Sequence, residues 1–146
     1  MTADATRIAN VLSDYCFFVD RLDVETVIDL FTEDARFDLG LGRVFTGREE
    51  LRRLYERLDV YTGTSHHLTN PRIDVNGDKA TARSGIYAHH RRHDGSTMSV
   101  WGVYDDELDR KGDRWLIRRR SLRASLEEGG RPDPGRDAHF ERLPRG

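Results

Sequence analysis

Apolar residues recur at helical spacing near the start of the chain and again around residue 55. Six of them predict a first helix over about residues 4–22: Ile8, Val11, Leu12, Tyr15, Val19 and Leu22. Asp23 stands where the N-cap of a short second helix is expected. Two short strands, ARFDLG and RVFTG, follow. Thr46 and Glu49 then have the spacing of a capping box that opens a third helix through Leu58.

Beyond Gly63 the apolar and polar positions alternate with period two, which is typical of strands. Four long strands are predicted over about residues 66–75, 79–92, 97–108 and 115–126, with Asn76-Gly77 as a hairpin turn. Helices followed by an antiparallel meander indicate an α+β fold. We expect a cone-shaped, curved antiparallel sheet wrapped around three N-terminal helices. It should form a single domain over residues 1–128, followed by an irregular C-terminal tail over residues 129–146.

The alternation also predicts which side chains face the helices. On the strand after the hairpin, the less charged set is expected inside: Ala80, Ala82, Ser84, Ile86, Ala88 and His90. On the strand before it, one face carries His66, Leu68 and Asn70, and the other carries His67, Thr69 and Ile73. The small residues Ala88 and Gly102 are expected to leave room for a pocket inside the curve.

The strand over residues 97–108 lacks a polar face. One side carries Met98, Val100, Gly102 and Tyr104, and the other carries Ser99, Trp101 and Val103. Both sides are therefore expected to be covered, and a second covered face on a one-domain protein suggests a subunit interface. We expect a homo-oligomer, a dimer or a trimer, with Trp101 and Tyr87 on the outer face of the sheet.

Composition narrows the class of protein. The 146 residues are 36% hydrophobic and 34% charged, but the net charge is only -2, so no basic surface for nucleic acid is expected. No apolar run approaches the roughly 20 residues of a membrane span, and no signal peptide is recognisable. A soluble, cytoplasmic protein is expected. The single cysteine, Cys16, excludes a disulfide within this chain and a multi-cysteine metal site.

One carboxylate interrupts the apolar pattern of the first helix. Asp20 follows the run YCFFV, where an ionised side chain is costly to bury without a partner. A carboxylate that holds one ring nitrogen of a histidine as N–H leaves the other nitrogen free as a base. Asp20 and His66 would form such a dyad. The alternative is that Asp20 caps a loop, or pairs with Arg21 or with an arginine on a strand.

A metal site is the other chemistry that these residues allow. His66, His90 and Asp20 would make a set of two histidines and one carboxylate. No metal-binding spacing such as HExxH supports this set. We therefore expect no metal and no other cofactor.

Four segments of the chain carry a family pattern: YCFFVDRLD, LFTEDARFD, SHHLTNPRIDVNGDKATA and VYDDELDRKGDRWLIRRR. They resemble the SnoaL-like family of the nuclear transport factor 2-like superfamily, over nearly the whole chain to about residue 126. That superfamily includes scytalone dehydratase, hexachlorocyclohexane dehydrochlorinase, polyketide cyclases, ketosteroid isomerase and the small subunits of ring-hydroxylating dioxygenases. The resemblance implies the cone fold and one pocket inside it.

The resemblance also implies roles for single residues. Asp20 and His66 fall on the Asp and His that the dehydrochlorinase and scytalone dehydratase carry late in helix one and early in the first long strand. Tyr15 falls where the dehydrochlorinase has a pocket lysine. His90, or His89 with one residue of slack, is nearest to the second pocket histidine of scytalone dehydratase. The expected substrate-binding residues are Tyr15, Phe37, Asn70, Ile86, Ala88, His90, Val100, Tyr104 and Arg120.

Arg120 falls on a pocket arginine that could stabilise a leaving anion or an enolate. The alternative for Arg120 is a solvated arginine on the surface of a strand. Tyr104 or Tyr15 could substitute for the tyrosines with which scytalone dehydratase holds a water, although neither position corresponds.

Together these residues predict a cofactor-independent acid–base enzyme that acts on a small, mostly apolar cyclic molecule through the dyad of Asp20 and His66. Dehydration, another β-elimination, isomerisation and cyclisation all begin with removal of a proton beside an activating group. The alternative is a non-catalytic role. The protein would then bind a small ligand, or serve as an accessory component of a ring-hydroxylating dioxygenase, like its small subunit.

Overall fold

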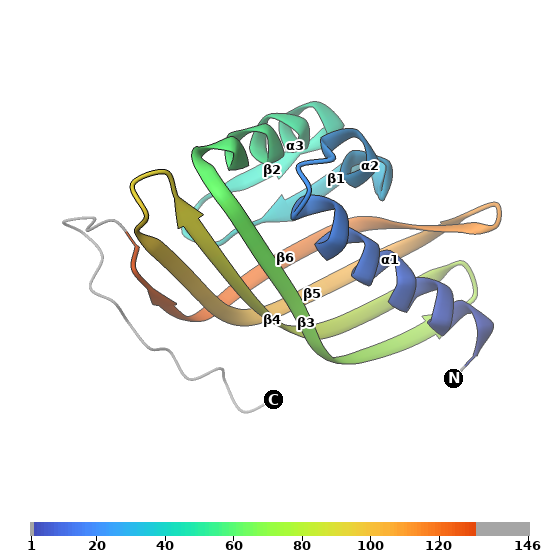
Figure 1. Cartoon of the computed structure of the whole chain (residues 1–146). Coiled ribbons are helices and arrows are strands. Elements are labelled where there is room, and N and C mark those ends of the chain that lie inside the picture. Colours follow the sequence, from blue (N-terminus) through green and yellow to red (C-terminus); the bar gives the residue numbers. More distant parts are fainter. Residues whose placement is uncertain (1, 131–146) are drawn as a thin grey trace.

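The computed structural model describes residues 2–130, which form three α-helices, one 3₁₀ helix and six strands (Figure 1). The helices are α1 (Ala3–Val19), α2 (Val24–Asp29) and α3 (Gly47–Glu56), followed by the 3₁₀ helix η1 (Arg57–Val60). The strands are β1 (Phe31–Asp38), β2 (Val44–Thr46), β3 (Tyr61–Asn76), β4 (Lys79–Arg92), β5 (Thr97–Lys111) and β6 (Arg114–Glu128). Most of the expected C-terminal tail, residues 131–146, lies outside the described residues.

Short polar side chains set where the first two helices begin. The Thr2 hydroxyl accepts a hydrogen bond from the Ala5 N–H at 3.2 Å and caps α1. The Asp23 carboxylate accepts one from the Thr26 N–H at 3.3 Å, so the predicted N-cap of α2 is confirmed. Within residues 2–130, no helix is both long and apolar enough to cross a membrane.

The start of α3 differs from the predicted capping box. Thr46 makes no side-chain cap bond, and its N–H donates to the carboxylate of Glu50 at 2.6 Å rather than to Glu49. Gly47, the first residue of α3, has a φ of +79°. With this left-handed residue at the start of α3, the side chain that accepts from the Thr46 N–H is that of Glu50, one residue later than predicted.

The six strands form one curved sheet in the order β2-β1-β6-β5-β4-β3. β3, β4, β5 and β6 pair as the predicted antiparallel meander, and the α+β fold with N-terminal helices is confirmed. One pair differs, because β1 lies parallel to β6 and makes the sheet mixed rather than wholly antiparallel. Most of the chain separates these two strands, so no hairpin forces them to be antiparallel. α1 lies across the concave side of the sheet, and α2 and α3 gather near β1 and β2 (Figure 1).

A bulge in β3 changes which of its side chains face the interior. The pairing with β4 shifts between Thr69 and Arg72, and Asn70 adopts a left-handed φ of +50° there. Asn tolerates this conformation better than most residues. The extra residue reverses the alternation, so Ile73 pairs opposite Ala82 and packs against the core, contrary to the predicted face. On β4, by contrast, all six residues predicted to face the helices are buried.

The sequence predicted that Gly102 would leave room for a ligand, and this prediction is wrong. Gly102 instead allows the close pairing of β5 with β6. A Cβ atom at this position would lie 2.3 Å from the carbonyl oxygen of Arg123 and 3.0 Å from the Cα atom of Ala124. The register between the two strands shifts between Trp101 and Gly102. At this bulge the backbone of β6 occupies the space into which a side chain would point.

Replacing Gly102 by alanine is expected to lower the free energy of unfolding by about 2 kcal/mol or more, because a clash with backbone is not relieved by rotating a side chain. Gly63→Ala on β3 is the matched control, since nothing lies within 4 Å of its added Cβ atom. Its free energy of unfolding is expected to change by less than about 0.5 kcal/mol. Urea denaturation followed by circular dichroism measures both. Equal losses in the two variants would contradict the close approach of β6.

Candidate active site

Asp20 stands at the end of α1 and turns its carboxylate toward β3. The Asp20 N–H still bonds to the carbonyl of Cys16 at 3.2 Å. Thr64 Oγ1 and His66 Nδ1 bond to Oδ1 of the carboxylate at 2.9 and 2.7 Å, and the backbone N–H of His66 donates to Oδ2 at 2.9 Å. The structure thus brings Asp20 and His66 together. Arg21, an alternative partner, instead lies over the ring of Phe17, 3.2 Å from its centroid.

Burial is the largest single influence on Asp20 and opposes its ionisation. The hydrogen bonds from the ring and the backbone of His66, the charge of His66 and the Thr64 hydroxyl outweigh burial together, so the pKa of Asp20 lies below its ordinary value. Asp20 is therefore a carboxylate at neutral pH. Because this carboxylate accepts from Nδ1, the neutral ring of His66 carries its proton on Nδ1 and its lone pair on Nε2.

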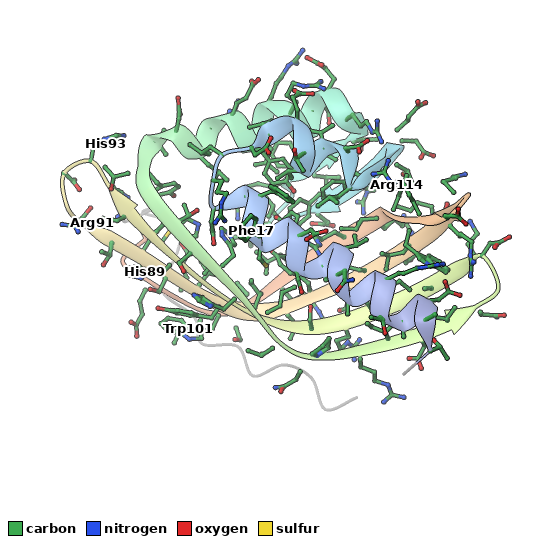
Figure 2. The ribbon with its side chains drawn as sticks, turned by 45° about the vertical axis from the view of Figure 1, so that its right-hand side comes forward. Phe17, His89, Arg91, His93, Trp101 and Arg114 are labelled. Atoms are coloured by element: carbon green, nitrogen blue, oxygen red, sulfur yellow. The ribbon has the colours of Figure 1, made fainter. Side chains whose placement is uncertain are left out.

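His90 lies inside the cone beside His66. The two ring centroids are 5.3 Å apart with the planes nearly perpendicular, and the ring of Tyr61 lies 4.8 Å from His90 on another side. Burial, and after it the charge of His66, lower the pKa of His90 to about 4. His90 is therefore neutral at pH 7, and its Nδ1 atom is buried without a hydrogen-bond partner. His89 points to the opposite side of the sheet (Figure 2), where its Nδ1 shares a 2.8 Å hydrogen bond with Ser99 Oγ.

Three buried phenols fill the cone next to α1. Tyr55 Oη donates to Tyr15 Oη at 3.3 Å, and the Tyr15 ring meets the rings of Tyr55 and Tyr104 edge to face, both at 6.0 Å. Burial raises the pKa of all three phenols, so they are neutral at pH 7. Burial also raises the pKa of the Cys16 thiol to about 11, which leaves it without nucleophilic character at neutral pH.

Arg120 lies within this group of phenols. Its guanidinium carbon is 4.1 Å from the ring centroid of Tyr15 and 4.2 Å from that of Tyr104. Nε and Nη2 donate to the two carboxylate oxygens of Asp106 at 2.7 and 2.9 Å, and neither side chain of this pair has any exposed surface. Burial opposes the charge of Arg120, but Asp106 and the phenols outweigh burial and raise the pKa of the guanidinium.

Arg120 is therefore a buried residue of the cone, and the alternative of a solvated strand arginine is wrong. Two of its nitrogens are held by Asp106, and Nη1 is buried without a hydrogen-bond partner. In this arrangement a molecule arriving from solvent does not reach the guanidinium, because aromatic rings cover it on two sides.

The other residues predicted to bind the substrate fall into two groups. Phe37, Ile86 and Ala88 are buried on the inner side of the sheet, and Val100 is half-buried opposite Ala88. Asn70 is exposed at the bulge of β3, four residues along the strand from His66. The structure does not bring Asn70 together with the other residues of this set.

Sequence reasoning missed Thr64, Tyr61 and Asp106. A signal for Thr64 was present, because a residue two positions before His66 on a strand shares its face. Asp106 is the cross-strand partner of Arg120 in the pairing of β5 with β6, which only the register reveals. Tyr61 lies beyond a register shift between Tyr61 and Gly63, so simple alternation from His66 does not give its face.

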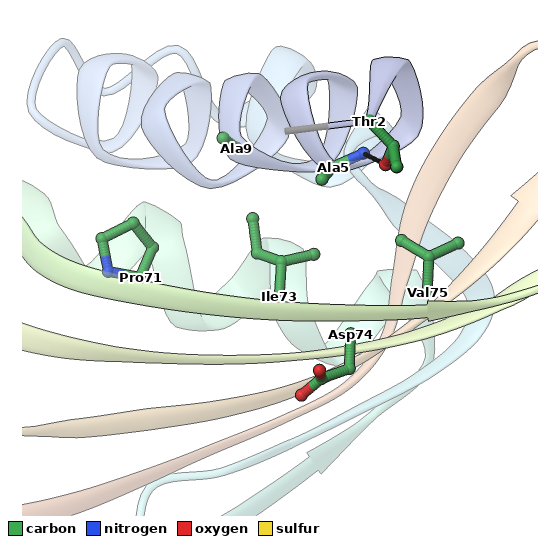
Figure 3. Close-up of a pocket in the computed structure, with 7 residues that line it drawn as sticks. All are labelled: Thr2, Ala5, Ala9, Pro71, Ile73, Asp74 and Val75. Atoms are coloured by element: carbon green, nitrogen blue, oxygen red, sulfur yellow. Dashed lines mark hydrogen bonds between the residues drawn. The ribbon is translucent and has the colours of Figure 1, made fainter.

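Two hollows lie away from Asp20 and His66. One, of about 490 Å³, lies between α1 and the far half of β3 and is lined by Thr2, Ala5, Ala9, Pro71, Ile73, Asp74 and Val75 (Figure 3). The other, of about 610 Å³, lies on the outer face of the sheet. Neither is lined by the dyad, so hydrogen-bond geometry rather than hollow volume locates the candidate active site. In residues 2–130, no three side chains of His, Cys, Asp or Glu converge as metal ligands would.

Removing the partner of the buried guanidinium is expected to be costly. Asp106→Asn leaves an uncompensated charge inside the cone and is expected to lower the free energy of unfolding by about 3–5 kcal/mol. Asp105→Asn is the matched control on β5, because Asp105 pairs with Arg83 and Arg123 at the surface. Its loss is expected to stay below about 1 kcal/mol. Similar midpoints of urea denaturation for both variants would show that the Arg120 charge does not depend on Asp106.

His90 is expected to make stability depend on pH. Its pKa is about 4 in the folded chain and about 6.5 when unfolded, so its contribution is present above pH 6.5 and is lost as the pH falls toward 4. From pH 7 to pH 5 the loss is expected to be about 1–2 kcal/mol. In His90→Gln this part of the pH dependence disappears, which urea denaturation at the two pH values measures. An unchanged pH dependence in the variant would argue against a neutral, buried His90.

Several solved structures of other proteins have the same fold as this chain. A candidate scytalone dehydratase from Novosphingobium aromaticivorans is 27% identical, with a TM-score of 0.84 over 92% of this chain and 95% of that chain. A candidate aromatic ring hydroxylase from the same organism is 28% identical, with a TM-score of 0.81 over 86% of this chain and 92% of that chain. A hexachlorocyclohexane dehydrochlorinase from Novosphingobium barchaimii, 19% identical, shares the fold, with a TM-score of 0.77 over 86% of this chain and 88% of that chain.

No curated protein matches the chain. The family model of the SnoaL-like domain, by contrast, matches residues 1–121, which include the dyad and all the helices within residues 2–130. Most of the chain is thus accounted for by one family. The chain belongs to the SnoaL-like family.

Proposed function

We propose that the protein is a cofactor-independent acid–base enzyme of the dehydratase or β-elimination type, with His66 as the base and Asp20 as the residue that orients it. The observation that carries this proposal is the contact of Asp20 with both the ring and the backbone of His66, at 2.7 and 2.9 Å. Two contacts from one residue fix the ring in position and direct Nε2 away from the carboxylate.

The reaction needs no group beyond those of the dyad and the substrate. Nε2 of His66 takes a proton from a carbon beside a carbonyl or another activating group, and the C–H electron pair becomes the new double bond. The leaving hydroxyl group departs with the electrons of its bond to carbon. The imidazolium of His66, stabilised by Asp20, then returns the proton to that hydroxyl, and water leaves.

His90 assists this transfer by staying neutral. A second imidazolium 5.3 Å from His66 would repel the proton that His66 must accept. With a pKa of about 4, His90 carries no charge at neutral pH.

The charges around the dyad favour a neutral substrate. Arg120 is the buried cation nearest the phenols, and its charge is matched by Asp106 within the protein. A carboxylate or phosphate group on a ligand would therefore find no unmatched cation among the buried residues of the described chain. Phe37, Ile86 and Val100 make the inner side of the sheet apolar, which suits a small cyclic molecule better than a charged one.

The relatives support this reaction class. The candidate scytalone dehydratase, 27% identical, is named for a dehydration, and the dehydrochlorinases share the fold. A second candidate function, as a component of an aromatic ring hydroxylase, is favoured by the similarity to the N. aromaticivorans protein with that name. A non-catalytic component would show no turnover that depends on His66.

The proposal is tested with neutral cyclic β-hydroxy ketones, 3-hydroxycyclohexanone first, by following the absorbance of the enone product. His66→Gln is expected to lower kcat by about 10²–10⁴-fold, the usual share of general acid–base catalysis. Asp20→Asn is expected to lower kcat at least tenfold with little change in KM, because it leaves the base in place but removes the negative charge that stabilises its imidazolium. His67→Gln, the neighbour on the opposite face of β3, is the matched control and is expected to leave kcat unchanged. Full turnover by His66→Gln would rule out the proposed base.

A further inference from the structure

The two histidines inside the cone are almost closed to solvent. The side chain of His66 is 8% exposed, and His90 is 7% exposed. Neither of the two hollows described above is lined by them. A general base must come within about 3 Å of the atom whose proton it takes, so a substrate has to reach Nε2 of His66. Some part of the protein must therefore move to admit it.

Most of the elements around these histidines are firmly held. α1 buries Cys16 and Val19 in the core just before it ends at Asp20. β3 and β4 pair without a register shift from Gly63 to Thr69. Moving either element would expose core side chains or break a run of backbone hydrogen bonds, and openings of that kind are the most costly ones in a protein.

The segment that joins α3 to β3 is held much more weakly. None of the four residues of η1 is buried, and Val60 is 56% exposed. The pairing of β3 with β4 is also irregular here, because the register shifts between Tyr61 and Gly63. Segments with few buried contacts open at the lowest cost in free energy. This segment is therefore the part of the surroundings that opens most readily.

The same segment lies directly beside the histidines. The Tyr61 ring packs against His90 with centroids 4.8 Å apart, and the rings of His90 and His66 are 5.3 Å apart. Tyr61 is only half-buried, so its ring separates the two histidines from solvent on this side. His93, in the turn between β4 and β5, ties the segment down, because its Nε2 donates to the carbonyl oxygen of Asp59 at 3.1 Å (Figure 2). Both residues of this contact are exposed.

We propose that residues 57–61 form a lid, which swings away from the turn between β4 and β5 to admit a ligand to His66 and closes with the Tyr61 ring against His90. The lid rests on the proposed function, because it gives the substrate a way to the same base. Opening breaks the exposed contact of His93 and one ring contact, and it leaves the core in place. Closing excludes water from the dyad while the proton is transferred.

Access of a small reagent to His66 tests the lid without a substrate. Diethyl pyrocarbonate reacts with a free ring nitrogen of histidine, and mass spectrometry of the peptides gives a rate for each histidine. If the lid is open for about a tenth of the time or less, Tyr61→Ala is expected to speed the reaction of His66 at least about tenfold. Tyr61→Phe keeps the ring and is the matched control, with an unchanged rate. His67, exposed on the opposite face of β3, is the internal reference.

Tethering the lid is the complementary experiment. Asp59→Cys and His93→Cys are combined and joined by a bis-maleimide that contains a reducible disulfide, while the buried Cys16 stays unmodified. The tether is expected to slow the reaction of His66 at least about tenfold and to lower kcat/KM for 3-hydroxycyclohexanone in parallel. Reduction of the tether is expected to restore both. Each single cysteine variant, treated in the same way, is a matched control that keeps its rate.

Two results would overturn the lid: a reaction of His66 that Tyr61→Ala leaves unchanged, or one that proceeds equally fast with and without the tether. Circular dichroism shows whether each variant has folded. If Tyr61→Ala fails to fold, the tethered protein still decides the question. If the unaltered protein turns over no cyclic ketone, the proposed function fails, while the reaction rates of His66 still decide whether residues 57–61 control access to it.

Discussion

The ion pair of Arg120 with Asp106 is the contact on which the interior of the cone depends. Two charges without solvent contact must remain together, because either one alone would be far more costly to bury. The guanidinium also lies between the rings of Tyr15 and Tyr104, which links β5 and β6 to α1. Since Tyr15 stands about one helical turn before the end of α1, this contact helps to place Asp20 over β3.

The interior of the cone contains two pairs of charged or titratable side chains that differ in what they can do. In one pair the two charges neutralise each other, and in the other pair a histidine nitrogen is left free to bind a proton. In the pair of Arg120 and Asp106, the carboxylate is occupied by two donors from the same guanidinium. In the pair of Asp20 and His66, the carboxylate is also fully engaged, but the ring retains a free nitrogen. The first pair holds the scaffold, and the second pair can exchange a proton. Thr64 belongs to the second pair, because its hydroxyl helps to keep Asp20 ionised beside the histidine.

The sequence predicted the features that depend on neighbours along the chain. Alternation predicted the buried face of β4, and Asp23 predicted the cap of α2, because both follow from spacings of a few residues. The carboxylate after an apolar turn pointed to a partner, and family resemblance pointed to His66. Other features depend on contacts between distant segments of the chain. These are the bulge at Asn70, the parallel pairing of β1 with β6 and the burial of Arg120. No local pattern encodes them, so the face of Ile73 and the role of Gly102 were predicted wrongly.

The bulge in β3 has a consequence for how molecules of this protein meet one another. β3 is the last strand in the order of the sheet, and its sixteen residues would present a long row of free N–H and C=O groups to another strand. The left-handed Asn70 and the adjacent Pro71, which has no N–H to donate, interrupt that row near its middle. At the opposite edge, β2 is only three residues long. Both edges are thus poor templates for strand addition, which protects the chain from open-ended polymerisation into fibrils and directs any association to the faces of the sheet.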